Sequence, residues 1–273
     1  MILYRTPGGW ILKTDRGHYR LPAPESGALT TMEDLEAYLA GIADSLAPAD
    51  EPLDLLPSIA HQEVWAAGVT YSRSRTARME EAQASGGGDF YDLVYTAERP
   101  ELFFKAVPRR VVGPGQNVRI RADAKWNVPE PEFTLLISPR GKILGYTIGN
   151  DMSSRDIEGA NPLYLPQAKV YDGSCAIGPG ILVTSEPLSP STRIQIEIRR
   201  GAKVEFAGAT ALSEMKRDFR TLVDYLYRET SFPDGCLLMT GTGVVPPDEF
   251  TLHHGDEILI TVEGIGTLHN KVE

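Results

Sequence analysis

The chain has 273 residues, with 37 acidic against 27 basic side chains and a formal net charge of −10. Hydrophobic residues make up 42% of it, enough for a sizeable globular core. The acidic balance argues against a general nucleic-acid binder or a protein of anionic membrane surfaces. No apolar run approaches the roughly 20 residues of a membrane span, and Met1–Gly17 lacks a signal-peptide pattern. Cys175 and Cys236 form no CxxC pair, so we expect a cytoplasmic protein.

The first part of the chain predicts a small N-terminal domain over residues 1–60. Its strand-like stretches are Met1–Tyr4 and Trp10–Lys13, on either side of Pro7-Gly8-Gly9. Thr30 and Glu33 have capping-box spacing and open a helical pattern through Leu35, Leu39, Ile42 and Leu46. Three prolines between positions 48 and 57 then predict an extended connector.

Residues 61–273 form the second predicted domain, and their pattern is mostly that of strands. The strand candidates are Val64–Val69, Leu102–Val107, Val118–Ile120, Phe133–Ile137, Ile143–Ile148, Arg193–Arg199, Lys203–Phe206, Ile258–Val262 and Thr267–His269. Helical patterns are few and cover Ser72–Ala84 and Ser213–Arg228. Strands dominate without regular alternation with helices, which predicts a β-rich α+β fold and argues against a doubly wound sheet.

An acidic cluster is the first candidate for chemistry. Glu130 and Glu132 lie two residues apart in a proline-flanked, extended stretch, so their side chains point to the same face. Ser138-Pro139-Arg140-Gly141 predicts a type I turn. Pairing Ser138 with Gly141 sets Glu130 opposite Gly149 and Asp151 diagonal to Glu130 on the same face.

Three carboxylates at one end of a hairpin repel one another unless a cation lies among them. Ligation by oxygen alone, without His or Cys, favours Mg²⁺, with Mn²⁺ or Ca²⁺ as alternatives, over Zn²⁺. The other interpretation of these carboxylates is a solvated acidic strand end beside a turn.

The order of motifs over roughly 64–273 resembles the fumarylacetoacetate hydrolase superfamily. The resemblance is carried by Glu130-x-Glu132, Asp151, Gln167-x-Lys169-x-x-Asp172, Gly178-Pro179 and Gly241-Thr242. It implies a mixed β-roll or distorted barrel with a smaller N-terminal domain. It also implies that Glu130, Glu132 and Asp151 are metal ligands, and that the protein forms a homodimer or homotetramer.

One branch of this superfamily fits the sequence better than the others. Hydrolase members have a catalytic His in the segment after their first strand, and residues 68–80 contain none. The sequence instead resembles the 2-keto-3-deoxy-D-arabinonate dehydratase branch in two long runs. These are Arg99-Pro-Glu-Leu-Phe-Phe-Lys105 and Asn161-Pro-Leu-Tyr-Leu-Pro-Gln167. The branch resemblance implies catalytic roles for Lys169 and Glu101 beside the metal.

The substrate contacts that we expect come from three places in the chain. Tyr71 and Ser72 lie where the entry loop should cross the site, and Lys105 either meets a substrate oxygen or pairs with a nearby acid. Thr242 presents its hydroxyl to the substrate carboxylate, unless Thr240–Thr242 is only a tight turn; Gly243 replaces the Pro common in the superfamily. The Ser72–Ala84 helix is either a lid that excludes water or a flexible surface loop.

The expected reaction is the dehydration of a small-molecule 2-keto acid, most simply 2-keto-3-deoxy-D-arabinonate or -xylonate to 2,5-dioxopentanoate. The carboxylate and ketone of such a substrate chelate Mg²⁺, which stabilises the enolate. A base must take the C3 proton and an acid must protonate the departing C4 hydroxyl. A nearby cation would lower the pKa of Lys169 and make it a base, and a sheltered Glu101 would be the acid, although sequence alone does not assign the two roles.

Two other functions stay open at this point. An acylpyruvate-type carbon–carbon hydrolase, or a decarboxylase or isomerase of 2-keto acids, uses the same chelated enolate. A non-catalytic metabolite-binding protein belongs to a different class, and the complete set of Glu130, Glu132, Asp151 and Lys169 argues against it.

Overall fold

The computed structural model describes residues 1–22, 28–72 and 93–273. The strands are β1 (Ile2–Thr6), β2 (Gly9–Thr14), β3 (Gly17–Arg20), β4 (Ala47–Ala49), β5 (Glu63–Gly68), β6 (Glu101–Ala106), β7 (Val111–Val112), β8 (Asn117–Val118), β9 (Asn127–Ile137), β10 (Ile143–Ser154), β11 (Cys175–Val183), β12 (Arg193–Arg200), β13 (Lys203–Ala211), β14 (Cys236–Met239), β15 (Glu257–Val262) and β16 (Gly266–Val272). The helices are α1 (Ala28–Thr31), α2 (Leu35–Ile42), α5 (Arg155–Ala160), α6 (Leu165–Lys169) and α7 (Phe219–Leu226). The predicted Ser72–Ala84 helix, and with it the lid, lies outside the described residues after Ser72.

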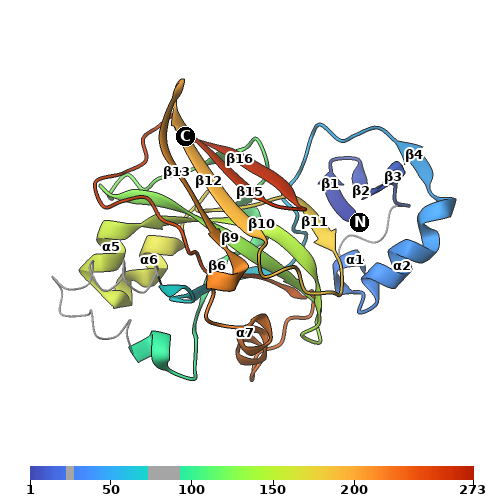
Figure 1. Cartoon of the computed structure of the whole chain (residues 1–273), viewed down its shortest axis with the longest axis horizontal. Helices are drawn as coiled ribbons and strands as arrows, with labels where there is room; N and C mark the ends of the chain where they lie inside the picture. Colours follow the sequence, from blue (N-terminus) through green and yellow to red (C-terminus); the bar gives the residue numbers. More distant parts are fainter. Residues whose placement is uncertain (23–27, 73–92) are drawn as a thin grey trace.

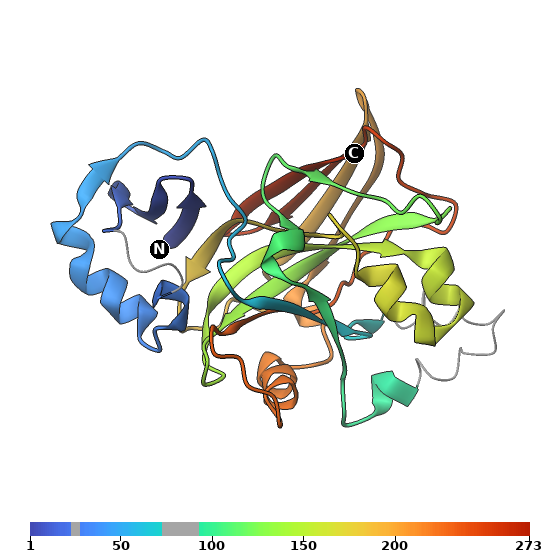
Figure 2. The same ribbon diagram turned by 180° about the vertical axis from the view of Figure 1, so that it is seen from behind.

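Two mixed sheets form the body of the molecule, which confirms the β-rich α+β prediction. The larger sheet has the order β4-β3-β2-β1-β11-β10-β9-β14-β5-β6, with β7 pairing beside β11. The smaller sheet has the order β13-β12-β15-β16-β8. One hydrophobic core contains side chains of both sheets, such as Phe133 and Ile148 from the larger and Ile196 and Ile260 from the smaller. Figures 1 and 2 show α5 and α6 at one end of the long axis and β1–β4 with α2 at the other.

The N-terminal strands continue the larger sheet. β1 and β2 confirm the two predicted strands, and Ile2 pairs with Leu182 of β11. A second core beneath them combines Leu12 and Leu35 with Ile177. The division into domains at residue 60 stays a prediction.

The predicted capping box is wrong, because Thr30 lies inside α1. Its hydroxyl accepts a hydrogen bond from the buried Gln62 amide, so a tertiary contact uses the group that a cap would need. The longer helix α2 begins only at Leu35 and ends at Ile42, before Leu46.

The hairpin of β9 and β10 carries the acidic cluster, and its predicted register was wrong by two residues. The turn forms as predicted, with the Gly141 N–H donating to the Ser138 carbonyl at 3.0 Å. Gly141 has a φ of +79° and acts as a bulge residue, so Ser138 bonds to Lys142 instead. A second irregularity after Ile143 adds another residue of shift. A shift of two keeps every side chain on its predicted face, and it sets Asp151 directly opposite Glu130.

The first half of β9 tolerates two prolines because one side of it has no neighbouring strand. β14 pairs with β9 only from Thr134 to Ile137, whereas β10 pairs along its whole length. Pro129 and Pro131 therefore lack N–H groups in a part of the strand whose other side is free of ladder bonds. The same opening gives access to Glu130 and Glu132.

The predicted Ser213–Arg228 helix is shorter than its pattern, since α7 begins at Phe219. Met215 makes a β-bridge with Tyr71, and the Lys216 N–H donates to the Thr70 carbonyl at 2.9 Å. These backbone bonds hold the start of the segment in an extended form. Asp218 then caps α7 by accepting from the Thr221 N–H.

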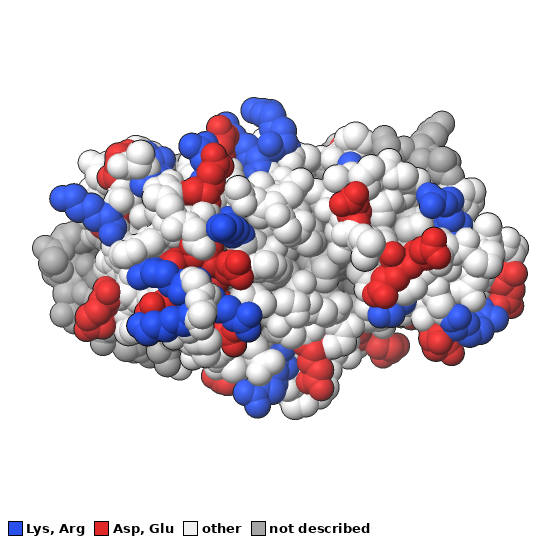
Figure 3. Space-filling view, turned by 90° about the horizontal axis from the view of Figure 1, so that it is seen from above, with Lys and Arg blue, Asp and Glu red and all other residues white. Residues whose placement is uncertain are grey.

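The surface gives no sign of a polyanion partner on the face that Figure 3 shows, where basic and acidic side chains are interspersed. Within the described residues, none of the helices has both the length and the apolar character needed to cross a bilayer.

Candidate active site

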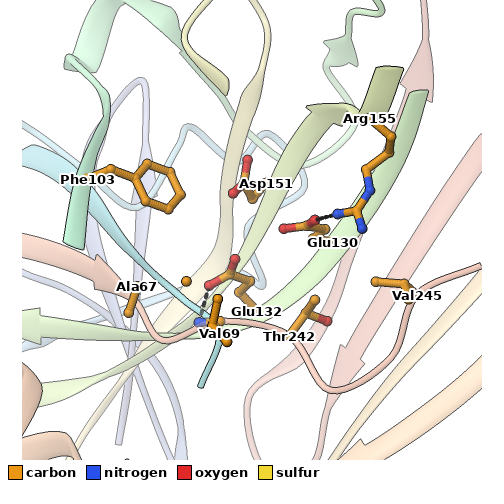
Figure 4. Close-up of a pocket in the computed structure, with 11 residues that line it drawn as sticks. Ala67, Val69, Phe103, Glu130, Glu132, Asp151, Arg155, Thr242 and Val245 are labelled. Atoms are coloured by element: carbon orange, nitrogen blue, oxygen red, sulfur yellow. Dashed lines mark hydrogen bonds and ion pairs between the residues drawn. The ribbon is translucent and has the colours of Figure 1, made fainter. Parts of the chain in front are cut away.

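Three buried carboxylates meet at the open end of the β9–β10 hairpin. Glu130, Glu132 and Asp151 each offer an oxygen atom, and these atoms all lie within 4.8 Å of one another. Their side chains are at most 4% exposed. Figure 4 shows the three carboxylates pointing toward one another in a cavity, between Phe103 and Arg155. The cluster that the sequence predicted is therefore assembled.

The electrostatics of this cluster indicate a site built for a cation. Burial, followed by the charges of Asp151 and Glu130, raises the pKa of Glu132 well above its ordinary value of 4.5. The N–H of Gly241 donates to one Glu132 oxygen at 2.5 Å, which opposes that rise. A divalent cation would compensate the same repulsion without a proton, and carboxylate oxygens are ligands that suit Mg²⁺. The residues present therefore fit this metal.

Lys169 lies at the end of α6 and is completely buried. Its ammonium donates to Glu130 Oε2 at 2.7 Å, to Asp151 Oδ2 at 2.9 Å and to Ser153 Oγ at 2.6 Å. It also lies 5.7 Å from the centre of the Phe103 ring, within the range of a cation–π contact. The structure thus brings the predicted catalytic lysine against the predicted metal ligands.

Lys105 lies behind the cluster and is absent from the residues that line the cavity. Its amine donates to the carbonyls of Met152 at 3.1 Å and Lys169 at 2.5 Å, and it forms an ion pair with Asp151. Of the two predicted roles, the structure shows the pairing with an acid, and the contact with substrate stays a prediction.

Glu101 begins β6 and pairs with Gly68, the last residue of β5. A Cβ atom on Gly68 would lie only 2.6 Å from the Glu101 carboxyl carbon. The Glu101 carboxyl group therefore occupies the space that a side chain at position 68 would need. Gly68 itself lines the cavity, and so does Phe103 two residues after Glu101. Glu101 is therefore placed next to two lining residues, Gly68 and Phe103, without being a lining residue itself.

Arg155 is a cavity residue that the sequence argument did not select. It begins α5 directly after β10, is 3% exposed, and donates to Glu130 Oε1 at 2.6 Å. Glu158, one turn later, lies 3.7 Å from the same guanidinium and is also buried. The four-residue step from Asp151 to Arg155 spans a strand-to-helix junction, and no simple periodicity reveals that both side chains reach one cavity.

The cavity is small, and the empty space in it, with its open mouth included, is about 350 Å³. Its lining residues are Ala67, Gly68, Val69, Phe103, Glu130, Glu132, Asp151, Arg155, Gly241, Thr242 and Val245. Val69 has a φ of +53°, which is rare and strained for a β-branched residue. The Thr70 hydroxyl, which donates to the Thr240 carbonyl at 2.6 Å, helps hold this conformation. Sequence gives no signal for such a backbone.

The remaining predicted substrate contacts differ in their placement. Thr242 lines the cavity, and its hydroxyl donates to the Val244 carbonyl at 3.0 Å. Tyr71 is buried outside the lining residues, where burial and the charges of Glu132 and Glu214 raise its pKa. Ser72 is exposed at the edge of the described segment.

Side chains of residues 68–71 fill the space beside the two glycines of the Thr240–Gly243 loop. A Cβ on Gly241, whose φ is +92°, would overlap the Thr70 hydroxyl. A Cβ on Gly243 would lie 2.5 Å from the Tyr71 ring. The two segments therefore interlock, and Gly243 replaces the superfamily's usual Pro at a point where the Tyr71 ring fills the space.

Comparisons with known proteins agree with this geometry. The family model for the fumarylacetoacetate (FAA) hydrolase C-terminal domain matches residues 63–273. The chain is 45% identical over 246 residues to a probable 2-keto-3-deoxyxylonate dehydratase of Haloferax volcanii, covering 90% of this chain and 84% of that protein. It is 44% identical over 213 residues to the 2-dehydro-3-deoxy-D-arabinonate dehydratase of Saccharolobus solfataricus, covering 77% and 72%.

A solved structure extends the likeness to the whole fold. The 2-keto-3-deoxy-D-arabinonate dehydratase complexed with magnesium and 2,5-dioxopentanoate superposes with a TM-score of 0.83 at 33% identity. The superposition covers 100% of this chain and 99% of that one. The fold, the acidic cluster and the matched sequence together show that the chain belongs to the fumarylacetoacetate hydrolase C-terminal family.

Proposed function

We propose that this protein is a metal-dependent hydro-lyase that dehydrates a 2-keto-3-deoxy sugar acid, with 2-keto-3-deoxy-D-arabinonate or -xylonate as the substrate and 2,5-dioxopentanoate as the product. The observation that carries the proposal is the contact of Lys169 with the Glu130 and Asp151 carboxylates on a small cavity. The identities of 44–45% to two dehydratases of such acids support the same substrate class.

Glu130, Glu132 and Asp151 are the residues that would hold Mg²⁺. Bound there, the ion would polarise the 2-keto group and stabilise negative charge that develops when C3 loses its proton. Arg155 and Lys105 orient Glu130 and Asp151 through the ion pairs described above. The positive charges of these two buried side chains would also balance the negative charge of the substrate.

Lys169 is the base in this proposal and Glu101 the acid. The Lys169 amine lies at the carboxylates, where the chelated end of a 2-keto acid would bind, so it is placed to take the C3 proton. Glu101, at the wall formed by Gly68, would protonate the departing C4 hydroxyl. Thr242 would bind the substrate carboxylate after its hydroxyl turns from Val244, and Tyr71 and Ser72 would shape the entrance.

The same cavity disfavours the carbon–carbon hydrolase. Among the described residues, none of those that line the cavity is a histidine, and His61 lies at the surface before β5. A His–Glu pair that activates water would have to come from elsewhere.

The decisive experiment incubates the purified protein with Mg²⁺ and 2-keto-3-deoxy-D-arabinonate in D₂O and follows the products by proton NMR. The proposal predicts an aldehyde product whose formation stops with EDTA. Lys169→Met should lose both dehydration and deuterium uptake at C3, whereas Glu101→Gln should retain the uptake and lose dehydration. Turnover of fumarylpyruvate or acetylpyruvate instead of the sugar acid would contradict the proposal.

Two further features belong to the proposal as expectations. We expect a homodimer or homotetramer and a cytoplasmic location. Sedimentation of the purified protein tests the first of these.

A further inference from the structure

Ser153 is the third acceptor of the Lys169 ammonium, and it differs in kind from the other two. It lies two residues after Asp151 on β10, on the same face of the strand, and is completely buried. Glu130 and Asp151 are charged and belong to the acidic cluster. Ser153 is neutral, and its oxygen lies 2.6 Å from the lysine nitrogen.

The Ser153 hydroxyl has a fixed direction. Its own proton goes to the Asp151 carbonyl at 3.1 Å, so the oxygen offers only a lone pair to Lys169. The other end of the lysine is held as well, because the Lys169 carbonyl accepts from Lys105 and from Ser174 Oγ at 3.0 Å. The amine therefore has one acceptor that neither carries charge nor competes for a cation.

We infer that Ser153 is a positioning residue, which fixes the Lys169 amine so that its lone pair is directed at C3 of the substrate. This inference rests on the proposed dehydratase function. A neutral amine has two N–H bonds and one lone pair, so it takes a proton efficiently only when its N–H bonds are held away from the substrate. A metal ion held by Glu130 and Asp151 would engage their oxygens. Ser153 would then remain as the acceptor that keeps the Lys169 amine in this orientation.

The chain offers a matched control in Ser154. It follows Ser153 on the same strand, is equally buried, and donates to Asn127 Oδ1 at 2.9 Å on the opposite face. Loss of either hydroxyl removes buried hydrogen bonds, each worth about 1 kcal/mol. The two alanine variants should therefore lose similar thermal stability and differ only in catalysis.

The test compares Ser153→Ala, Ser153→Thr and Ser154→Ala for kcat, KM, melting temperature and Mg²⁺ affinity by calorimetry. Ser153→Ala should lower kcat on the order of 10- to 100-fold while KM and the Mg²⁺ dissociation constant stay within about threefold. Ser153→Thr should recover most of kcat, and Ser154→Ala should keep it. Should Ser153→Ala fail to fold, Ser153→Cys retains the size with a much weaker acceptor and should show the same loss.

Equal losses of kcat in the two alanine variants would overturn the inference, and so would a fall in Mg²⁺ affinity that parallels the fall in kcat. A normal kcat in Ser153→Ala would do the same. Absence of sugar-acid turnover in the wild-type protein would instead refute the proposed function, so the two failures are distinguishable.

Discussion

Substitution of Gly68 by alanine should displace Glu101 and test its role without touching the acid itself. Gly68 has no left-handed φ, so the backbone accepts alanine and the conflict lies with the Glu101 carboxyl group. The nearest carboxyl atom, Glu101 Oε2, would lie 2.0 Å from the new Cβ, so the carboxyl group must retreat by about 1.4 Å to reach ordinary contact at 3.4 Å. Misplacement of a catalytic group by about 1 Å costs on the order of 100-fold in rate, or about 2.7 kcal/mol of barrier. The carboxyl ends a flexible side chain, so the loss of stability should stay below about 1–3 kcal/mol.

The assay measures kcat and C3 deuterium uptake for Gly68→Ala beside Gly41→Ala. Gly41 lies in α2 with nothing within 4 Å of an added Cβ, so its variant should keep full activity and gain about 0.4–1 kcal/mol of stability. Gly68→Ala should lose dehydration and keep deuterium uptake, as Glu101→Gln should. Dehydration at more than half the wild-type rate in Gly68→Ala would refute the assignment of Glu101 as the acid.

Three further predictions follow from the site. The pKa of Glu132 is raised in the folded protein, so its protonated form stabilises the metal-free protein. This contribution is full below pH 4.5, the ordinary pKa, and is lost as the pH rises through the raised pKa. Mg²⁺ affinity should rise over the same window with release of a proton, and calorimetry should show neither effect in Glu132→Gln. Lys105→Met removes one of the two buried lysines that pair with Asp151 and should cost up to about 3–5 kcal/mol in chemical denaturation; a loss under 1 kcal/mol would speak against the ion pair. Gly243→Ala should cost about 1–3 kcal/mol by contact with the Thr210 hydroxyl and the Tyr71 ring, and the part of that cost due to the ring should vanish when Tyr71→Ala is already present.

The acidic cluster was predictable because it depends on local rules. Alternation fixed the common face of Glu130 and Glu132, and the turn sequence joined their strand to the one that carries Asp151. The register error did not matter because two bulge residues shift the pairing by an even number, which preserves the face. A single bulge would have turned Asp151 away from the cavity.

Features that depend on distant parts of the chain were beyond such rules. Lys105 looks like any strand lysine, and only the packing of β6 against β10 and α6 shows that its charge is buried and shared. The position of Arg155 in the cavity depends likewise on the bend between β10 and α5, which the sequence pattern does not predict. The backbone of Val69 is held in part by one hydrogen bond, from the Thr70 hydroxyl to the carbonyl of Thr240, 170 positions later in the chain.

The pairing of β1 with β11 has a consequence for any shortened form of this protein. β11 carries Cys175 opposite Asp151, and further along it pairs with Ile2 and Leu3. Removal of the first 60 residues would strip this strand of its neighbour and leave a row of unpaired backbone groups next to apolar side chains such as Ile181. Open edges of that kind recruit other chains into mixed sheets. We therefore expect the N-terminal segment to protect this strand edge from self-association.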